Sequence, residues 1–391
     1  MPTESRSRDS RLQTSTGRQD WSTWPVYESA ELGLRNFWYP VLWARQVRDR
    51  PVPILLGGER IVLQRDGGHV YALNDRCPHR GVPLSLGTQE FPGTITCPYH
   101  GWTYDLSDGR LCAAITDGPD SPIVDKVTVR TYPTAERLGL IWVFLGDPGV
   151  SVPDVETDIP DELADRPLII GGRIEPDRQG NWRYAAENGF DEGHAKFLHR
   201  YSLWAGFRQL PVWNETRIER SPDNRWIVRR QERVHWEADF PGLGRWTQAR
   251  WWKRSQTAAK PTDDPRVDPK IAALELPAKA SLRLPGLLRI AYPKYIHYEW
   301  AIPETAETHR YIQLLVGFAE EPLERAWFGA RYLGYIRWAF HGQFTGQDSW
   351  MVDVMDIPPE RLYRPDVSVL EWRKLVEEQH RERSAASSAT E

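Results

Sequence analysis

The sequence predicts an α+β protein built from two parts, an all-β module and a larger region that combines antiparallel strands with helices. From about residue 37 to residue 147, short runs of β-branched and aromatic residues alternate with turns rich in Gly and Asp, which is typical of a small all-β module. From residue 168 onward, strand-like segments occur beside helix-like ones, as expected when helices are segregated from an antiparallel sheet.

Four segments of the first module are predicted strands, because they are rich in apolar residues and are bounded by turns such as Gly57-Gly58. They are Ile54–Leu56, Arg60–Gln64, Val70–Leu73 and Leu140–Leu145. The segment 149–167 holds three prolines and six acidic residues, so we expect a linker or a loop that runs over a surface.

The second region is predicted to hold strands, helices and one mobile loop. The predicted strands are 168–174, 226–236, 295–300 and 311–318. The predicted helices are 181–198, 323–344 and 367–383, and the loop is 254–277. Within 295–300, Ile296, Tyr298 and Trp300 fall on one face of the strand.

The composition excludes several classes of protein. Fifty Lys and Arg against 54 Asp and Glu give a net charge of −4, which argues against a nucleic-acid-binding protein. Three cysteines in 391 residues exclude a disulfide scaffold and favour a reduced, intracellular protein. No segment has the apolar run of a signal peptide or a membrane span, so we expect a cytoplasmic protein. Nineteen tryptophans predict a large core or an aromatic-lined cavity.

These observations divide the chain into four parts. We expect a polar N-terminal arm at residues 1–30, the all-β module at 31–150, the larger region at 151–383 and a disordered polar tail at 384–391.

The first chemical motif is a pair of segments that each supply one cysteine and one histidine. Cys77 and His79 form a C-x-H pair, and Cys97 and His100 form a C-x2-H pair seventeen residues later. Thiolates and imidazoles in two short segments predict a metal site. A zinc site would more often take two cysteines from one segment and two histidines from the other. One Cys and one His from each segment instead suits two distinct irons, the arrangement of a Rieske [2Fe–2S] cluster.

The second motif is D-x2-H-x4-H, formed by Asp191, His194 and His199. The two histidines are five residues apart, about 140° around an ideal helix, so they converge on one metal only if the helix bulges or ends between them. Two histidines and one carboxylate form the facial triad of non-haem Fe(II) oxygenases, which leaves positions open for oxygen. We predict Asp348 as the carboxylate, with Asp353 and Asp356 as alternatives.

With both motifs in one chain, the sequence resembles the α subunit of a Rieske non-haem iron ring-hydroxylating oxygenase, from about Asn36 to the last helix. Within that family, three short segments resemble the homotrimeric angular carbazole dioxygenases: Leu32–Pro40, Glu187–His194 and the ending Trp372-Arg-Lys-Leu.

The resemblance implies a β Rieske domain that binds its cluster through Cys77, His79, Cys97 and His100. It also implies a helix-grip catalytic domain that holds Fe(II) through His194, His199 and Asp348. Members of this type form head-to-tail homotrimers, in which Asp191 would link His100 of one subunit to His194 of the next. Electrons would come from NAD(P)H through a reductase and a ferredoxin, in the cytosol of a bacterium.

The implied reaction inserts O2 into an aromatic or heteroaromatic ring, by cis-dihydroxylation or at an angular carbon. We expect an apolar pocket with few polar groups. Phe344 is a candidate wall, and the carbonyl of Gly189 is a candidate acceptor for a ring N–H. Two alternatives are a Rieske monooxygenase, which demethylates aryl ethers or hydroxylates alicyclic rings, and an electron carrier without the oxygenase iron.

Overall fold

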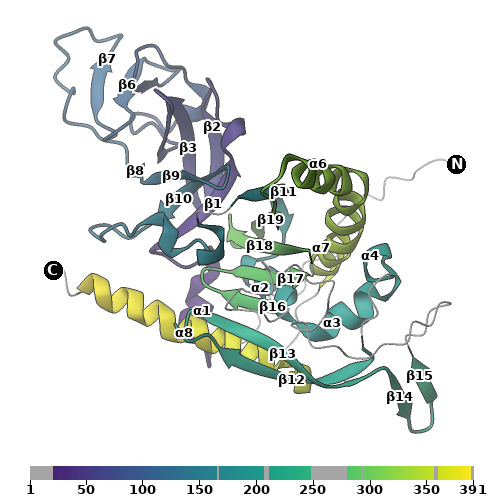
Figure 1. The fold of residues 1–391 in the computed structure, drawn as a ribbon. Coiled ribbons are helices and arrows are strands. Elements are labelled where there is room, and N and C mark those ends of the chain that lie inside the picture. Colours follow the sequence, from purple (N-terminus) through teal and green to yellow (C-terminus); the bar gives the residue numbers. More distant parts are fainter. Residues whose placement is uncertain are drawn as a thin grey trace, which may run out of the picture.

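The computed structural model describes residues 21–164, 167–206, 211–247, 280–292, 294–355 and 360–388. Figure 1 shows the first domain at one end of the molecule and a larger domain of sheet and helices below it. The predicted α+β class, with a β module followed by a helix-grip domain, is confirmed.

The first domain consists of three antiparallel sheets, in the orders β2-β3-β4-β8, β1-β10-β9 and β5-β6-β7. The strands are β1 (Phe37–Trp43), β2 (Val52–Leu56), β3 (Glu59–Asp66), β4 (His69–Asn74), β5 (Thr94–Thr96), β6 (Trp102–Asp105), β7 (Leu111–Ala114), β8 (Thr131–Tyr132), β9 (Thr134–Arg137) and β10 (Leu140–Leu145). The four predicted strands correspond to β2, β3, β4 and β10.

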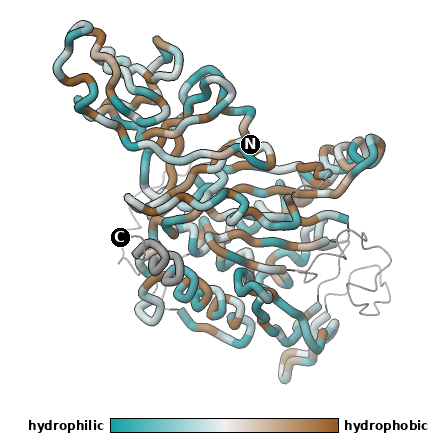
Figure 2. The backbone as a smooth tube through the Cα atoms, turned by 60° about the vertical axis from the view of Figure 1, so that its left-hand side comes forward, coloured by the Kyte–Doolittle hydropathy of each residue, from teal (hydrophilic) through white to brown (hydrophobic). Residues whose placement is uncertain are grey.

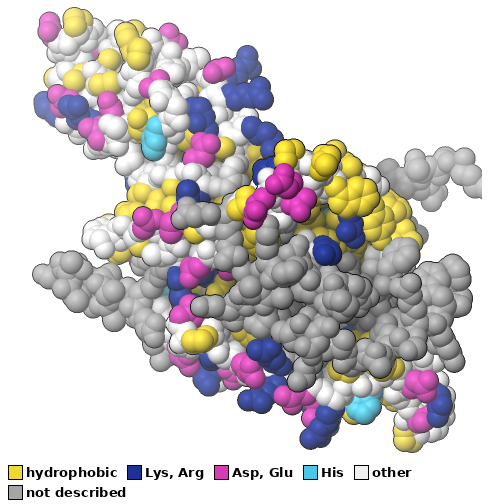
Figure 3. All heavy atoms as spheres, in the orientation of Figure 1, with side chains coloured by type: hydrophobic (Ala, Val, Ile, Leu, Met, Phe, Trp, Pro, Cys, Tyr) yellow, Lys and Arg dark blue, Asp and Glu magenta, His cyan; other side chains and the backbone are white. Residues whose placement is uncertain are grey.

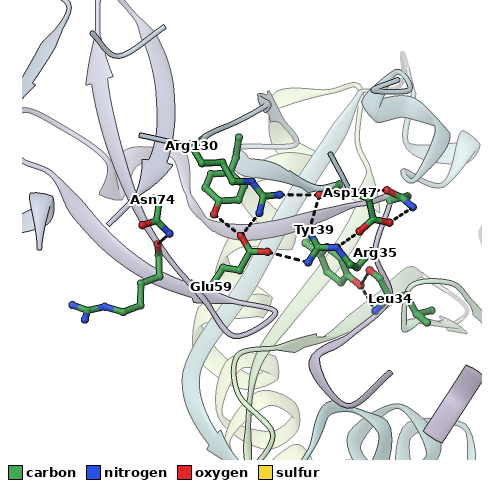
Figure 4. A network of polar contacts seen from close by, with 11 residues as sticks. Leu34, Arg35, Tyr39, Glu59, Asn74, Arg130 and Asp147 are labelled. Atoms are coloured by element: carbon green, nitrogen blue, oxygen red, sulfur yellow. Dashed lines mark hydrogen bonds and ion pairs between the residues drawn. The ribbon is translucent and has the colours of Figure 1, made fainter. Parts of the chain in front are cut away.

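A partly exposed network of ion pairs and hydrogen bonds links the β2-β3-β4-β8 sheet to segments that flank the β1-β10-β9 sheet (Figure 4). Glu59, at the start of β3, accepts from Arg35 (2.9 Å), from Arg130 (2.8 Å) and from the hydroxyl of Tyr132. Arg35 also donates to Asp147, past the end of β10 (2.5 Å). Burial raises the pKa of Glu59, but the hydrogen bonds from Tyr132 and Arg35 outweigh it and hold this pKa below its ordinary value.

The second domain contains a seven-stranded antiparallel sheet in the order β11-β19-β18-β17-β16-β13-β12. Its strands are β11 (Leu168–Gln179), β12 (Trp213–Arg220), β13 (Trp226–His235), β16 (Ala280–Arg283), β17 (Leu287–Tyr292), β18 (Tyr295–Pro303) and β19 (Thr308–Phe318). A separate hairpin pairs β14 (Glu237–Phe240) with β15 (Gly244–Thr247). The four strands predicted in this region fall on β11, β13, β18 and β19.

The helices are short except for the last. They are α1 (Pro25–Ser29), α2 (Trp182–Phe190), α3 (Glu192–Phe197), α4 (Leu203–Gly206), α6 (Pro322–Arg331), α7 (Thr345–Val354) and α8 (Val367–Ser388). Single 3₁₀ turns lie at Ala30–Leu32, Ala44–Gln46, Leu84–Leu86, Val155–Thr157, Asp161–Leu163, Leu198–Tyr201 and Arg364–Asp366. Two π-helical turns, Tyr332–Ile336 and Ala339–Phe344, connect α6 to α7.

The interior strand β18 is buried along its whole length, and its two faces meet different partners. The predicted face of Ile296, Tyr298 and Trp300 packs toward the first domain, where Trp300 makes an edge contact with Trp142 of β10 (ring centroids 5.9 Å apart). Tyr298 donates to Glu162 in the 149–167 segment (2.8 Å), which therefore covers this face as predicted. Hydrophobic residues accordingly run along the strands of both domains in Figure 2.

The structure differs from the predicted N-terminal arm, because residues 21–30 belong to the core. Tyr27 in α1 is fully buried; its N–H donates to Glu377 of α8 (2.9 Å) and its hydroxyl donates to Glu187 of α2 (2.9 Å). Arg183 donates to the carbonyl of Tyr27 (2.9 Å). These partners lie far along the chain, so the local sequence does not reveal them. Residues 1–20 and the predicted loop 254–277 lie outside the described residues.

Two predicted helices also differ from the structure. The helix predicted over 181–198 is interrupted at Asp191, whose backbone is extended (ψ 133°). The helix predicted over 323–344 does not end there, because it continues through the π-helical turns into α7. At the C-terminus, α8 continues to Ser388 and so includes most of the predicted tail.

The α6 region presents an apolar surface to solvent (Figure 3). Leu323, Trp327, Leu333 and Trp338 are each more than half exposed. A contiguous exposed apolar surface is more typical of a protein–protein contact than of the solvent-exposed surface of a monomer. Among the described residues, no helix is long and apolar enough to cross a membrane.

Candidate iron sites

Two loops at the tip of the first domain share one backbone form. In each, the N–H of the cysteine, Cys77 or Cys97, donates to the carbonyl five residues later (2.9 and 2.8 Å). The N–H of the glycine four residues on, Gly81 or Gly101, donates back to the cysteine carbonyl (2.8 and 3.1 Å). Both glycines have positive φ, 74° and 67°, and a Cβ on Gly101 would lie 2.9 Å from the Cβ of Ile115. The repeated geometry places the two cysteine–histidine pairs opposite each other.

The four predicted cluster ligands lie together in these loops. Cys77 and Cys97 are buried, with 1% and 3% of their surface exposed, whereas His79 is exposed. The rings of His79 and His100 have centroids 4.6 Å apart, and His79 stacks on Trp102 (4.7 Å). His100 Nδ1 is buried with no hydrogen-bond partner in the described structure. The thiols are therefore buried and the imidazoles lie nearer the surface, and one imidazole has an unpaired nitrogen. This arrangement fits a binuclear cluster with its histidines at the outer edge.

The zinc alternative fits this geometry less well. A compact metal site needs three or more His, Cys, Asp or Glu side chains whose ligand atoms all lie within 4.8 Å of one another. Within the described part of the chain, one group meets this condition, and it consists of His194, His199 and Asp348. The four cluster residues are not drawn to a single point, as tetrahedral zinc would require. The hydroxyl of Tyr104 lies 3.3 Å from Cys77 Sγ; this contact was not predicted, although Tyr104 follows the second loop closely in sequence.

The second site is built around the break between α2 and α3. Asp191 ends α2 and caps α3, accepting from the N–H groups of Gly193 (2.7 Å) and His194 (3.0 Å). Asp191 therefore pairs with His194 of its own chain through this cap. Asp191 Oδ2 lies 3.2 Å from His194 Nδ1, so the carboxylate orients the imidazole.

The predicted break between the two histidines is confirmed. The α-helix ends at Phe197 and a 3₁₀ turn, Leu198–Tyr201, carries His199. This tightening lets both rings meet Asp348 from α7. Asp348 Oδ1 lies 3.4 Å from His194 Nε2 and 3.1 Å from His199 Nε2.

The three groups suit a divalent cation. His199 is fully buried, and its Nε2 makes no hydrogen bond of acceptable geometry within the described residues. Its Nδ1 lies 2.9 Å from Gln347 Oε1, which leaves Nε2 as the lone-pair nitrogen when Nδ1 carries the proton. Asn188 donates to Asp348 (3.3 Å) and fixes that carboxylate. Sequence reasoning missed Gln347 and Asn188, although each stands close to a predicted ligand.

Charge in this site is arranged for a cation. Burial raises the pKa of Asp191, but hydrogen bonds from His194 and from backbone N–H groups outweigh it and lower this pKa to about 2. Asp348 has its pKa lowered in the same way, by His194 and His199. Burial lowers the pKa of His194, yet Asp191 and Asp348 raise it to about 9. The two carboxylates therefore stay ionised beside the imidazoles and supply the negative charge that a metal ion needs.

The other candidates are placed as follows. Asp353 is exposed on α7 and is not part of the triad, and Asp356 lies outside the described residues. Phe344 stacks on the ring of His199 (centroids 3.7 Å apart). Gly189 packs on the sheet so closely that a Cβ would lie 2.8 Å from Leu288 Cδ2.

Comparisons with known proteins agree with this geometry. Residues 37–133 match the family model of the Rieske [2Fe-2S] domain, and residues 144–228 and 254–383 match that of the homotrimeric ring hydroxylases. The chain is similar to the carbazole 1,9a-dioxygenase terminal oxygenase component of Sphingomonas sp, with 31% identity over 94% of this chain and 98% of the relative.

Two further relatives bear on function. The oxygenase component of chloroacetanilide N-alkylformylase from Rhizorhabdus wittichii is 29% identical over 83% of this chain and 86% of the relative. The solved reduced complex between oxygenase and ferredoxin in carbazole 1,9a-dioxygenase is similar in fold, with a TM-score of 0.74, 28% identity and coverage of 91% of this chain and 92% of that one. By its two matched domains and its full-length relatives, the chain belongs to the homotrimeric ring hydroxylases and is a Rieske-type oxygenase.

Proposed function

We propose that this chain is the terminal oxygenase of a multicomponent dioxygenase, which inserts O2 into a carbazole-like aromatic or heteroaromatic ring. The observation that carries the proposal is the presence, in one chain, of the paired cysteine–histidine loops and of the His194, His199 and Asp348 triad. A [2Fe–2S] cluster passes single electrons, and a triad-bound Fe(II) with open positions binds and activates oxygen.

The residues divide the work between the two sites. Cys77, Cys97, His79 and His100 hold the cluster, and the exposed edge of His79 is where an electron leaves or enters. His194, His199 and Asp348 hold Fe(II), with the rings oriented by Asp191 and Gln347. Phe344 forms an apolar wall on His199, against which a flat ring can stack.

A carbazole-like substrate follows from the relatives and from the aromatic ring of Phe344 beside the triad. Dihydroxylation would give a cis-diol, or an unstable hemiaminal if attack is at an angular carbon that bears nitrogen. The carbonyl of Gly189 is a candidate acceptor for the ring N–H. Among the described tryptophans that follow Trp204, Trp213 and Trp246 are exposed and are poor candidates for such a wall.

A monooxygenase is the second candidate, because the similar oxygenase component of chloroacetanilide N-alkylformylase is named for an N-alkyl group and not for an aromatic ring. The same triad serves both reactions, so only the products separate them. The electron-carrier alternative is disfavoured, since a carrier has no use for three convergent ligands beside a buried, unpartnered imidazole nitrogen.

A homotrimer gives Asp191 its proposed role between subunits. It would accept a hydrogen bond from the neighbouring subunit's His100 while it orients His194 in its own chain. Electrons would reach the cluster from NAD(P)H through a reductase and a ferredoxin, since the related oxygenase is solved in complex with a ferredoxin. We place the protein in the bacterial cytosol, in keeping with its bacterial relatives.

The test is metal analysis combined with oxygen uptake on the full chain. We expect the two cluster irons plus one further iron per chain. With a ferredoxin–reductase donor, we expect oxygen uptake that depends on an added carbazole-like or biaryl compound. Products carrying both oxygen atoms would support dioxygenation. Two irons only, or zinc in place of iron, would contradict the proposal.

Docking of the donor gives a further prediction. Arg76 and Arg80 are exposed beside the first cluster loop, where they suit an acidic ferredoxin. Changing both to Glu should raise the KM for the donor about tenfold or more at low salt and less at high salt. The matched control changes the exposed Arg48 and Arg50 to Glu, which alters net charge equally away from the cluster loops. An equal effect of both double variants would refute local docking.

A further inference from the structure

Residues 360–366, between α7 and α8, are held beside the second iron site by buried ion pairs. Arg373 of α8 is 1% exposed and donates two hydrogen bonds to the carboxylate of Glu360, each 2.8 Å long. The same guanidinium donates to Glu187 of α2 (2.8 Å). Such bidentate pairing fixes direction as well as distance. Arg373 therefore ties this segment to the helix that leads into Asp191.

Within this segment, Tyr363 lies at the start of α3. Its N–H donates to Asp366 (2.9 Å), which closes the turn before α8. A Cβ on Gly193 would lie 2.5 Å from the Tyr363 hydroxyl and 3.4 Å from Asp191 Oδ1, so the phenol and the carboxylate lie on the same side of this glycine. Partial burial raises the pKa of Tyr363, and the carboxylates of Asp191 and Asp366 raise it further, so the phenol stays neutral.

Both Tyr363 and Asp191 can be reached from outside the chain. Tyr363 is 62% exposed, and Asp191 keeps 24% of its side chain exposed. Among the described residues, Asp191 accepts from the N–H groups of Gly193 and His194 and lies beside His194 Nδ1. An ionised carboxylate has about four lone-pair sites, so it has room for a further donor from outside. Tyrosine is enriched in protein–protein interfaces, which indicates that this opening is a contact surface.

We propose that Tyr363 is a positioning residue for electron transfer between subunits: its ring forms the surface on which the neighbouring subunit's second cluster loop docks, and it excludes water from Asp191. This rests on the proposed function, in which Asp191 accepts from the neighbouring subunit's His100. A charge-assisted hydrogen bond is stronger where water is excluded, because the effective dielectric constant falls. On the opposing surface, Tyr99 lies against His100 (ring centroids 3.7 Å apart) and is 54% exposed, so the two tyrosines face each other across the contact.

The contact is tested without turnover, by cross-linking of the holoenzyme. The chain carries Tyr363→Cys and Tyr99→Cys, and the exposed Cys112 is changed to Ser. A short bismaleimide should then join subunits into dimers and trimers on a denaturing gel. The control replaces Tyr363→Cys by Leu323→Cys, which is 84% exposed at the start of α6 and should give no such products. Equal cross-linking of the two chains would overturn the contact.

The effect on electron transfer is tested with pre-reduced holoenzyme in a single turnover. Tyr363→Ala opens Asp191 to water, so oxidation of the cluster should slow about tenfold or more. Its iron content, its cluster spectrum and its Kd for carbazole, measured by equilibrium dialysis without reductant, should match those of the parent. Tyr363→Phe keeps the ring and should oxidise within about threefold of the parent rate, since water stays excluded. The matched control, Leu323→Ala, removes an exposed apolar side chain from α6 and should keep the parent rate.

The outcomes separate this inference from the proposed function. An unchanged rate in Tyr363→Ala would overturn it, as would a loss of iron in that variant, which would show a structural role. Tyr363→Phe as slow as Tyr363→Ala would also overturn it, because the hydroxyl and not the ring would then act. Cross-linking through position 363 in a protein that takes up no oxygen would refute the oxygenase alone. Oxygen uptake without cross-linking would refute the docking surface alone.

Discussion

Replacement of Asp348 by Ala is expected to remove the mononuclear iron and abolish turnover while the cluster spectrum stays intact. The variant keeps the imidazoles of His194 and His199 but loses their only anionic partner in the triad. The segment that carries the two imidazoles changes from α-helix to 3₁₀ turn between them. Since even residues behind the ligands cost about 10–100-fold when lost, removal of a ligand should reduce activity more than about 100-fold. Iron analysis and the visible spectrum of the cluster measure the two outcomes separately.

Two variants sharpen this prediction. Asp348→Asn keeps the shape of the side chain but has no charge, so it should also lose the iron, which excludes a cavity as the cause. Asp353→Ala, on the exposed side of the same helix, should retain iron and activity. If Asp353→Ala instead loses the iron, our ligand assignment is wrong although the triad idea survives. If Asp348→Asn retains full iron and activity, the carboxylate is not a ligand.

Replacement of Asp191 by Ala should preserve all the iron and a normal cluster spectrum yet slow turnover about 100-fold. The carboxylate holds the His194 ring at 3.2 Å and, in the proposed trimer, links it to the neighbouring cluster through a charge-assisted hydrogen bond. The direct measurement is a single turnover of pre-reduced enzyme, in which oxidation of the cluster after addition of substrate and oxygen should become very slow.

The cap that Asp191 provides to α3 has to be separated from this role. Loss of a cap costs about 1 kcal/mol of stability, whereas Asn caps a helix about as well as Asp. Asp191→Asn should therefore keep the Tm of the parent but share the slow cluster oxidation of Asp191→Ala. Fast oxidation in Asp191→Asn would show that the residue serves only the helix, and the route between subunits would lie elsewhere.

The sequence by itself predicted the β module and the four residues that we propose as its cluster ligands. Cys77 and His79, like Cys97 and His100, are set by backbone hydrogen bonds that span only five residues, so a local pattern specifies their geometry. Four of the ten strands of this module, β2, β3, β4 and β10, were predicted for the same reason, since tight turns bound them. The D-x2-H-x4-H motif likewise predicted an irregular helix. Two histidines that are five residues apart cannot face the same point on a regular helix.

Only the tertiary structure decided which carboxylate completes the triad. Asp348 and Asp353 stand on the same helix, but Asp348 lies on the face toward His194 and His199 and Asp353 lies on the exposed face. It also decided that residues 21–30 join the core, through partners in α2 and α8. The placement of His297 against Phe340 and near His341 depends on strand register and on a π-helical turn. Such contacts join residues far apart in the chain, and their energy comes from packing that no local pattern encodes.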